Sequence, residues 1–463
     1  MESSQVFSAK TAAANDKVLV VVDRFPATGG SRIDKFVKLL PDFGVEPVVL
    51  SAAETDSTFA QEIKHRIYPS TLKTFLAKSM GWSYFTERFL MRGKGARHYR
   101  LLSLLSFPER FLFVPDYMVR WIPLGIRTAT RVIREEGIRV VLTSSPSESV
   151  HLIGLRLKRK FGVRWVADFR DLWTEKELLY RPATPLHDWW IRRLERRVFE
   201  MADHVIANTP ENAERYVRRF GLSRDRISVI PNGFDRTDLA HGRDVSTSSP
   251  KEFRIGYSGS LDKHDFPWRI ALQALKLLAE EVGRDRVRLV HCGYLSETVK
   301  GYLRQEEIED LVEAHGNLSH VDAMALTANT EIRLVLLYEN AYSESIVPMK
   351  LYNYLIMEGP ILAIAPEEGR TAAIIRETRM GVVISKRRGV AQVHAQLKKY
   401  FEGWERGQLT VEPNLENIAQ YDRDIQTMNL ARVLCAHRRP PHNIEEVQDL
   451  PNVAKKYNNC ISA

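Results

Sequence analysis

Short continuous runs of Val, Ile and Leu recur along the chain and alternate with stretches of helical periodicity. In the first half these runs predict strands over residues 17–22, 46–50, 139–143, 164–168, 204–208 and 227–230. In the second half they predict strands over residues 253–257, 287–291, 332–337, 360–364 and 381–384. Continuous apolar runs are typical of strands covered on both faces, and intervening helical patterns such as residues 270–278 supply that cover. The pattern therefore predicts an α/β protein with parallel sheets.

The two groups of strands predict two doubly wound, Rossmann-like domains that face each other across a cleft. A polar stretch rich in serine, residues 236–250, separates the groups and reads as a linker. We expect an N-terminal domain over residues 17–235 and a C-terminal domain over residues 251–412, with a further helical pattern over residues 415–432. Residues 1–16 read as a disordered leader and residues 435–463 as an irregular tail. In such sheets ligands bind beyond the carboxyl ends of the strands.

Composition excludes several classes of protein. With 44% hydrophobic and 27% charged residues, the 463-residue chain is neither wholly disordered nor fibrous. No apolar run approaches the roughly 18 to 20 residues of a spanning helix, and no secretory signal opens the chain. The cysteines Cys292, Cys435 and Cys460 form no metal or disulfide spacing, which fits a reducing, cytoplasmic compartment.

The positive charge is concentrated in one window. Residues 64–134 hold fourteen Lys or Arg against three acids, a net charge of +11, whereas the whole chain carries +9. This window is also the part of the chain densest in aromatic residues. Basic and aromatic residues together favour a membrane surface or nucleic acid, and the alternative is a local core with solvated arginines.

Two adjacent glycines follow the first predicted strand. Gly29 and Gly30 lie between that strand and the helical pattern of residues 33–40. Glycines let a backbone approach a ligand closely, and a helix N-terminus favours phosphate. The segment is neither G-x-G-x-x-G nor a P-loop, so it predicts a ligand-facing turn or, alternatively, a plain strand-to-helix connection.

Charged residues follow a buried strand of the first half. Arg170 and Asp171 come directly after residues 164–168, where alternation can place them in the cleft. A carboxylate there can orient a hydroxyl or accept a proton, and the alternative is a structural Asp–Arg pair. His151, on a predicted helix, is a weaker catalytic candidate, because lone helical histidines are more often structural.

Small and cationic residues mark the second half. Gly259 and Ser260 follow its first strand and can receive a diphosphate through backbone N–H groups, with Lys263 just beyond. Lys350 and Asn353 lie on the helix that Pro348 is expected to open. A lysine near a helix N-terminus is unfavourable for the helix dipole, which indicates that Lys350 meets an anion.

The ordered set of motifs resembles the GT-B glycosyltransferases, in particular the bacterial group 1, or family 4, enzymes, over roughly residues 17–434. The motifs are Thr28-Gly-Gly30, Ser144-Ser-Pro146, His151-Leu-Ile-Gly154, Asp168-Phe-Arg-Asp-Leu-Trp173, Pro231-Asn-Gly233, Tyr257-Ser-Gly-Ser-Leu261 and Pro348-Met-Lys-Leu-Tyr-Asn-Tyr354. The resemblance implies transfer of a sugar from a nucleotide donor, usually with retention and without an essential metal or other cofactor. It also implies that the donor lies against the C-terminal domain and the acceptor against the N-terminal one, with a final helix, residues 415–434, crossing back to the first domain.

The resemblance assigns roles to individual residues. Two glutamates are frequent in the family where this chain has Ser345 and Asn353, and an arginine is common where it has Ser260. The expected donor-binding residues are Gly29, Gly30, Gly259, Ser260, Lys263, Ser345, Lys350 and Asn353. The expected acceptor-binding residues are Ser145 and Arg170, and the expected catalytic residues are Asp171 and His151. No metal site is expected.

The resulting hypothesis is a glycosyltransferase that moves a sugar from a nucleotide-diphosphate donor to a glycan or lipid-linked acceptor in polysaccharide biosynthesis. The basic window predicts peripheral contact with an anionic membrane on its cytoplasmic side. The alternatives are a degenerate, non-catalytic GT-B subunit, a nucleotide-sugar 2-epimerase of the same fold and, as the weakest, a nucleic-acid binder.

Overall fold

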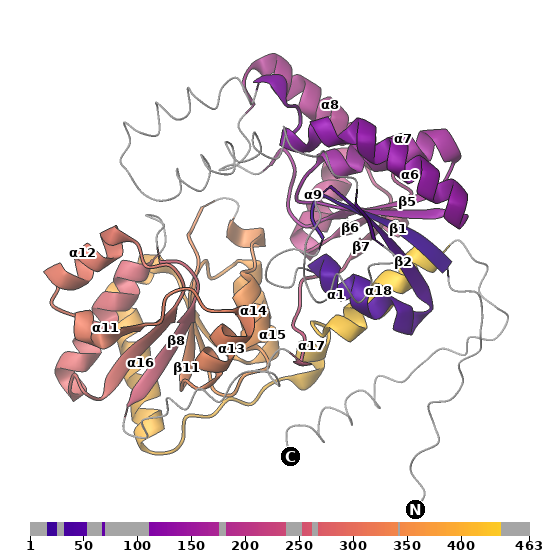
Figure 1. Cartoon of the computed structure of the whole chain (residues 1–463). Coiled ribbons are helices and arrows are strands. Elements are labelled where there is room, and N and C mark those ends of the chain that lie inside the picture. Colours follow the sequence, from indigo (N-terminus) through magenta and orange to yellow (C-terminus); the bar gives the residue numbers. More distant parts are fainter. Residues whose placement is uncertain are drawn as a thin grey trace, which may run out of the picture.

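The protein contains two parallel sheets (Figure 1). The computed structural model describes residues 16–25, 32–52, 67–69, 111–175, 182–237, 252–261, 267–340 and 343–436. The first sheet has the order β3-β2-β1-β4-β5-β6-β7 and consists of β1 (Asp16–Val22), β2 (Val45–Ser51), β3 (Ile67–Pro69), β4 (Val140–Ser144), β5 (Arg164–Phe169), β6 (His204–Ala207) and β7 (Ile227–Val229). The second has the order β10-β9-β8-β11-β12-β13 and consists of β8 (Phe253–Ser258), β9 (Val287–Cys292), β10 (Val312–Ala314), β11 (Ile332–Leu336), β12 (Ile361–Ile364) and β13 (Gly381–Ile384).

Helices cover both faces of each sheet. Those associated with the first sheet are α1 (Arg32–Leu39), α6 (Ile122–Glu136), α7 (Ser149–Phe161), α8 (Pro185–Met201), α9 (Pro210–Phe220) and α18 (Arg423–Cys435), with the 3-10 turns η1 (Leu40–Phe43), η3 (Tyr117–Trp121) and η4 (Arg224–Arg226). Those associated with the second are α11 (Trp268–Val282), α12 (Glu297–Gln305), α13 (His320–Ala328), α14 (Met349–Tyr354), α15 (Arg370–Thr378), α16 (Gly389–Glu405) and α17 (Leu415–Ala419), with the 3-10 turns η5 (Glu309–Leu311), η6 (Ser343–Ser345) and η7 (Lys386–Arg388).

Alternation along β1 shows why its sheet is covered on both sides. Leu19 and Val21 belong to the core formed with α6, α7, α8 and α9. Val18, Val20 and Val22 belong to a separate core, which also holds Ile33 of α1 and Leu430 of α18. Successive strand side chains point to opposite faces, so a continuous apolar run is what a sheet with helices on both sides requires. The prediction of a doubly wound α/β fold is confirmed.

The predicted strands are all present, most of them with ends shifted by one residue. The sequence pattern missed β3 and β10, which are edge strands of three residues each. The helical pattern over residues 415–432 is one interrupted stretch, because α17 and α18 are separated by Gln420–Asp422. In that break the Phe234 N–H donates to the carbonyl of Tyr421 over 3.0 Å, and the Arg423 N–H donates to the carbonyl of Phe234 over 3.1 Å. This backbone pairing with a distant segment replaces the helical hydrogen bonds.

Each sheet reverses its strand order at one point, between β1 and β4 in the first sheet and between β8 and β11 in the second. The connections of the neighbouring strands diverge there and leave a crevice outside the carboxyl ends. In the first sheet Asp23 and Ser145 directly follow β1 and β4. In the second sheet the turn at Gly259 follows β8, and Leu337 and Tyr338 follow β11. The topology therefore predicts that ligands bind at these strand ends.

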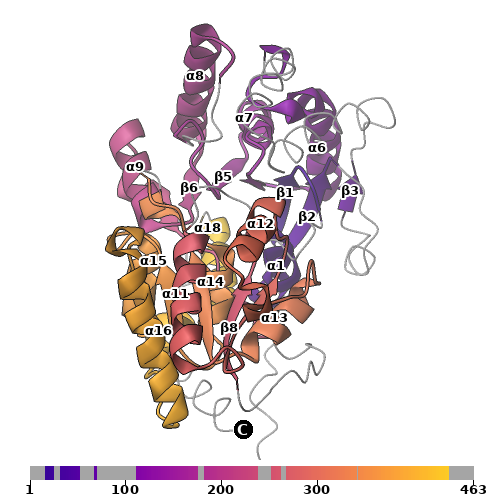
Figure 2. The same cartoon turned by 90° about the vertical axis from the view of Figure 1, so that its left-hand side faces the viewer.

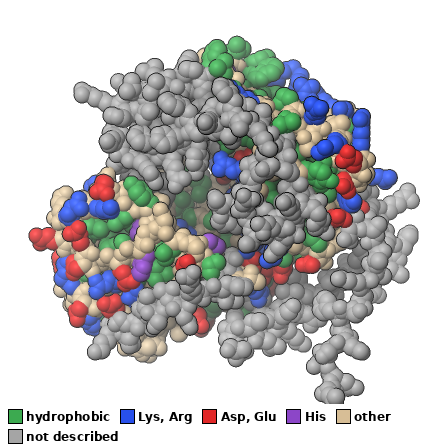
Figure 3. Space-filling model, viewed as in Figure 1, with side chains coloured by type: hydrophobic (Ala, Val, Ile, Leu, Met, Phe, Trp, Pro, Cys, Tyr) green, Lys and Arg blue, Asp and Glu red, His purple; other side chains and the backbone are tan. Residues whose placement is uncertain are grey.

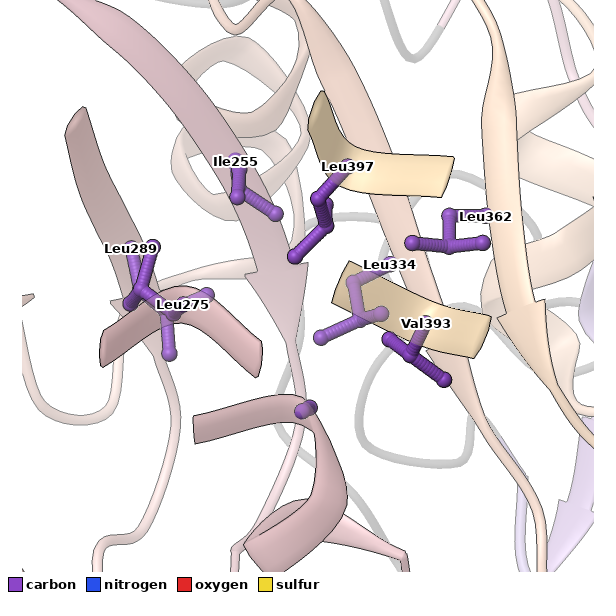
Figure 4. Close-up of a pocket in the computed structure, with 8 residues that line it drawn as sticks. Ile255, Leu275, Leu289, Leu334, Leu362, Val393 and Leu397 are labelled. Carbon is purple, nitrogen blue, oxygen red and sulfur yellow. The ribbon is translucent and has the colours of Figure 1, made fainter. Parts of the chain in front are cut away.

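A small cavity of about 20 Å³ lies within the core of the second sheet, away from those strand ends (Figure 4). Its lining consists of aliphatic side chains from the sheet, α11 and α16: Ile255, Ala271, Leu275, Leu289, Leu334, Leu362, Val393 and Leu397. No polar group of this lining can orient a substrate, so the cavity is a packing defect of the core.

His204 makes the stability of the first domain sensitive to acid. Burial lowers the pKa of His204 to about 4 from its usual 6.5, and its Nε2 lies 2.8 Å from Ser228 Oγ. Between pH 6.5 and 4 the unfolded chain binds a proton at this position that the folded chain does not bind. By linkage this contribution to stability is full above pH 6.5 and is lost as the pH falls towards 4.

We expect His204→Gln to lose less thermal stability than the wild type when the pH is lowered from 7.5 to 5. Glutamine retains hydrogen-bonding capacity towards Ser228 but does not titrate. Melting curves of both proteins across this range test the prediction. Parallel pH profiles would show that His204 is protonated equally in the folded and unfolded chain.

Candidate functional site

The turn after β8 brings together several residues that the sequence singles out. Gly259 has φ +134°, a backbone conformation that side chains disfavour. A Cβ added there would lie 2.6 Å from Lys350 Nζ, so the ammonium group of α14 lies directly against the Gly259–Ser260 turn. The same Nζ lies 3.7 Å from the centroid of the Tyr257 ring. The aromatic face thus holds a cation at the switch point of the second sheet.

His291 and Tyr354 fix this turn from below. His291 is fully buried, its ring stacks on that of Tyr257 with centroids 5.9 Å apart, and its Nε2 lies 2.8 Å from the carbonyl oxygen of Gly259. A protonated Nε2 donates to that oxygen. Burial, together with the positive charge of Lys350, lowers the pKa of His291, which favours the neutral imidazole. From the other side the Ser258 N–H donates to Tyr354 Oη over 3.1 Å.

A buried ion pair organises the facing edge of the first sheet. Arg32 Nη2 lies 3.2 Å from Asp168 Oδ1, and both side chains are at most 2% exposed. Ser144 donates to Asp168 Oδ2 over 2.7 Å, and Arg32 Nη1 donates to the carbonyl of Pro231 over 2.6 Å. The pair therefore joins α1, the ends of β4 and β5, and the start of the segment that leads to the second domain. Burial nevertheless lowers the pKa of Arg32.

Ser145, Arg170 and Asp171 lie together beyond the same strands. The Arg170 N–H donates to Ser145 Oγ over 3.2 Å, so the buried hydroxyl of Ser145 supports the backbone of the β5 end. Asp171 is exposed. Burial is the first cause of the raised pKa of Tyr338 and the charge of Asp171 is the second. Because Tyr338 follows β11, Asp171 faces the second domain at its switch point.

The junction of the two domains holds a second buried guanidinium. Arg423, the first residue of α18, donates to Gln426 Oε1 over 2.8 Å and lies 5.7 Å from the Phe36 ring. Burial, and then the charge of Arg32, lowers the pKa of Arg423 to about 9. Tyr352 of α14 lies within the electrostatic reach of both guanidinium groups. Arg32 and Arg423 of the first domain and Tyr352 of the second domain thus lie close together at the junction.

The remaining predicted site residues fall in different places. His151 is buried, with Nδ1 2.8 Å from Thr143 Oγ1 and its ring 4.3 Å from that of Phe169. Its catalytic role stays a prediction, since these neighbours belong to the core of the domain. Ser345 is buried in η6 and Asn353 is half-buried on α14, four residues before the buried Met357. Gly29, Gly30 and Lys263 lie outside the residues that the structure describes.

Sequence reasoning missed Arg32, His291 and Arg423 as parts of the site. Arg32 directly follows the Gly-Gly-Ser segment, which is the one local signal for it. Within the described ranges no group of three or more His, Cys, Asp or Glu side chains can hold a metal ion. The helices of those ranges likewise include none that is long and apolar enough to cross a membrane.

Comparison with known proteins agrees with this geometry. The family model for Glycosyltransferase Family 4 matches residues 90–238. A curated relative from Nocardia farcinica (strain IFM 10152), D-inositol 3-phosphate glycosyltransferase, is 33% identical over 95 residues. That match covers 19% of this chain and 21% of the relative. The chain has the GT-B fold, and residues 90–238 are similar to Glycosyltransferase Family 4.

Solved structures support the GT-B fold over about 90% of this chain. Sucrose-phosphate synthase from Thermosynechococcus elongatus is similar with a TM-score of 0.59 and 13% identity, over 90% of this chain and 98% of that one. The Anabaena protein HepE, in complex with UDP and glucose, is similar with a TM-score of 0.52 and 14% identity, over 90% and 99%. At these identities the likeness establishes the two-domain architecture, and the reaction has to be argued from the site.

We expect Asp168→Asn to destabilise this GT-B protein strongly. The substitution leaves the buried guanidinium of Arg32 without a counter-charge, and breaking a buried pair costs about 3 to 5 kcal/mol. Urea denaturation followed by tryptophan fluorescence measures the effect. The double variant Arg32→Met/Asp168→Asn serves as the control, because it removes the orphaned charge and should recover part of the loss. An equal loss in the single and double variants would show that the pair is not coupled.

Proposed function

We propose that this protein transfers a sugar from a nucleotide-diphosphate donor to a glycan or lipid-linked acceptor, with retention at the anomeric carbon and without a metal. The observation that carries the proposal is the position of Lys350 Nζ against the Gly259–Ser260 turn, at the switch point of the second sheet. The complex of HepE with UDP and glucose supports a nucleotide sugar as donor.

The arrangement suits departure of a diphosphate. Cleavage of a sugar–phosphate bond builds negative charge on the leaving group, and fixed cations and N–H groups stabilise it. The Lys350 ammonium, held over the Tyr257 ring, and the backbone of the Gly259–Ser260 turn are in place for this role. Gly29 and Gly30 are expected to approach the same group from the first domain. Ser345 and Asn353 leave the donor side without the two glutamates frequent in the family.

In this proposal the acceptor binds at the edge of the first sheet. Asp171 is exposed and faces Tyr338, so its carboxylate can orient an acceptor hydroxyl, with Arg170 beside it. The leaving phosphate takes the acceptor proton in this scheme, and no protein nucleophile is needed. Closure of the two domains excludes water, which would otherwise hydrolyse the donor.

Peripheral contact with an anionic membrane completes the proposal. The basic window of residues 64–134 supplies the charge, and a lipid-linked acceptor would be presented at such a surface. The structure describes residues 67–69 and 111–134 of this window. We place the protein in the cytoplasm, on the inner face of the membrane.

Lys350→Ala should weaken binding of the nucleoside diphosphate product about ten- to hundredfold, because one charge-assisted contact is lost. Calorimetric titration with UDP, GDP and ADP identifies the nucleotide and measures the loss. Lys300→Ala is the matched control, since Lys300 lies on the surface of α12, 2.8 Å from Glu297. Unchanged affinity in Lys350→Ala, with an unaltered melting curve, would remove Lys350 from the donor site.

Turnover separates the enzyme from its alternatives. Release of the nucleoside diphosphate from a panel of nucleotide sugars, dependent on an acceptor, is the expected result. Tight binding without turnover would indicate a non-catalytic subunit. Interconversion of the donor sugar in the absence of an acceptor would indicate a 2-epimerase.

Co-sedimentation with vesicles tests the prediction that residues 64–134 contact a membrane. The protein should co-sediment with vesicles that contain phosphatidylglycerol, and salt should weaken the binding without abolishing it, because charge is screened and apolar contact is not. The quadruple variant of Arg88, Arg92, Lys94 and Arg97, each changed to Gln, should bind much less while turning over a short soluble acceptor normally. Wild-type protein that stays in the supernatant at low salt would contradict membrane contact.

A further inference from the structure

One end of α8 carries an apolar face that points outwards. Leu186, Trp189 and Trp190 are 69%, 55% and 47% exposed. Their spacing of three and four residues places them on one side of the helix, whereas Ile191 and Val198 bury the opposite side. Two large aromatic side chains are thus exposed to water on one helix face. An exposed apolar patch of this kind is typical of an interaction surface.

Phe111 and Leu112 extend this patch. They are 48% and 68% exposed and lie beside the start of α8. The rings of Phe111 and His187 have centroids 4.8 Å apart, and His187 Nε2 lies 3.0 Å from the carbonyl oxygen of Phe111. His187 Nδ1 lies 2.7 Å from Thr184 Oγ1, the hydroxyl that caps the helix. The two apolar groups are therefore tied into one surface, which we call the α8 tip (Phe111, Leu112, Leu186, Trp189 and Trp190).

The α8 tip projects beyond the edge of the sheet that holds the acceptor side of the site. Glu195 accepts hydrogen bonds from the N–H and hydroxyl of Thr174 over 3.1 and 2.6 Å, and Thr174 follows β5. Leu186 lies nine residues before Glu195, which corresponds to about 13 Å along the helix. Figures 1 and 2 both show α8 at the end of the first domain that is remote from the second sheet.

Basic side chains predominate on the exposed surface of α6, α7 and α8. Arg193 lies one turn further along the same face, with its guanidinium 5.8 Å from the centroid of the Trp189 ring. Among the exposed side chains of α6, α7 and α8, nine are basic and two, Glu135 and Glu200, are acidic. In Figure 3 hydrophobic side chains gather over α8, and lysine and arginine side chains lie beside them over α6 and α7.

We propose that the α8 tip inserts into the headgroup layer of an anionic membrane. Tryptophans with neighbouring arginines suit this layer, where the rings reach the acyl boundary and the guanidinium groups meet lipid phosphates. The inference rests on the membrane contact proposed above and gives it a surface that, apart from Phe111 and Leu112, lies outside residues 64–134.

The triple variant Leu186→Ser/Trp189→Ser/Trp190→Ser tests the α8 tip. Its affinity for vesicles of phosphatidylcholine with phosphatidylglycerol should fall at least tenfold in co-sedimentation, while calorimetric UDP binding stays unchanged. Leu277→Ser/Leu318→Ser is the matched control, since both leucines are 40% exposed elsewhere and the change should leave vesicle binding intact. Trp189→Phe/Trp190→Phe keeps the apolar face and should retain vesicle binding, which guards against a folding defect in the triple variant.

The outcomes distinguish this inference from the wider proposal. If the triple variant binds vesicles as the wild type does while the quadruple variant of residues 88–97 does not, the membrane contact stands and the α8 tip is not part of it. If the wild type does not bind anionic vesicles, both the membrane contact and the role of the α8 tip are overturned. A lipid-free dimer that the triple variant disrupts would assign the surface to a second copy of the chain and overturn the lipid assignment. Quenching of wild-type tryptophan fluorescence by brominated lipid, reduced in the triple variant, would support insertion.

Discussion

The buried pair of Arg32 and Asp168 is the interaction on which the edge of the first sheet facing the second domain depends. Two charges removed from water are better tolerated when further hydrogen bonds compensate them. Here the Ser144 hydroxyl donates a hydrogen bond to Asp168, and Arg32 donates one to the carbonyl of Pro231. These three contacts fix the start of α1, the ends of β4 and β5, and the segment that leaves the first domain. Arg170 and Asp171 extend from β5 directly after this anchor, so the direction in which they point is set by it.

The corresponding edge of the second sheet is organised differently. Its cation, Lys350, lies over an aromatic ring and against a glycine turn, and the ring itself stacks on a buried histidine. The quadrupole of the aromatic ring attracts the ammonium group and helps to hold it at the turn. The cation of the first sheet therefore lies in a buried ion pair, whereas the cation of the second sheet lies against an aromatic ring and a glycine turn.

The sequence predicted the strand framework because parallel, doubly covered strands leave a continuous apolar signature. It also selected Lys350 and Gly259 separately, and the structure shows them in contact. The pair of Arg32 and Asp168 was out of reach, since 136 positions separate them and no local periodicity links them. The break between α17 and α18 was equally hidden, because it arises from backbone pairing between Phe234 and Tyr421. His151 shows another limit of the sequence. Helical spacing alone does not distinguish a histidine buried in the core from one that faces a cleft.

Separate cores allow the two edges to be altered independently. The cores around the first sheet contain side chains up to Ile230 and again from Leu430 onwards, whereas those around the second sheet contain side chains from Phe234 to Tyr421. The chain crosses between them at Pro231–Asp235 and at Tyr421–Arg423, where the backbones pair and Lys35 lies 2.6 Å from Asp235. Substitutions in separate cores have additive effects on stability when they share no partner. Contacts shared across the crossings, such as those of Arg423 and Tyr352, are where additivity should fail, because there the position of one domain sets the surroundings of charges in the other.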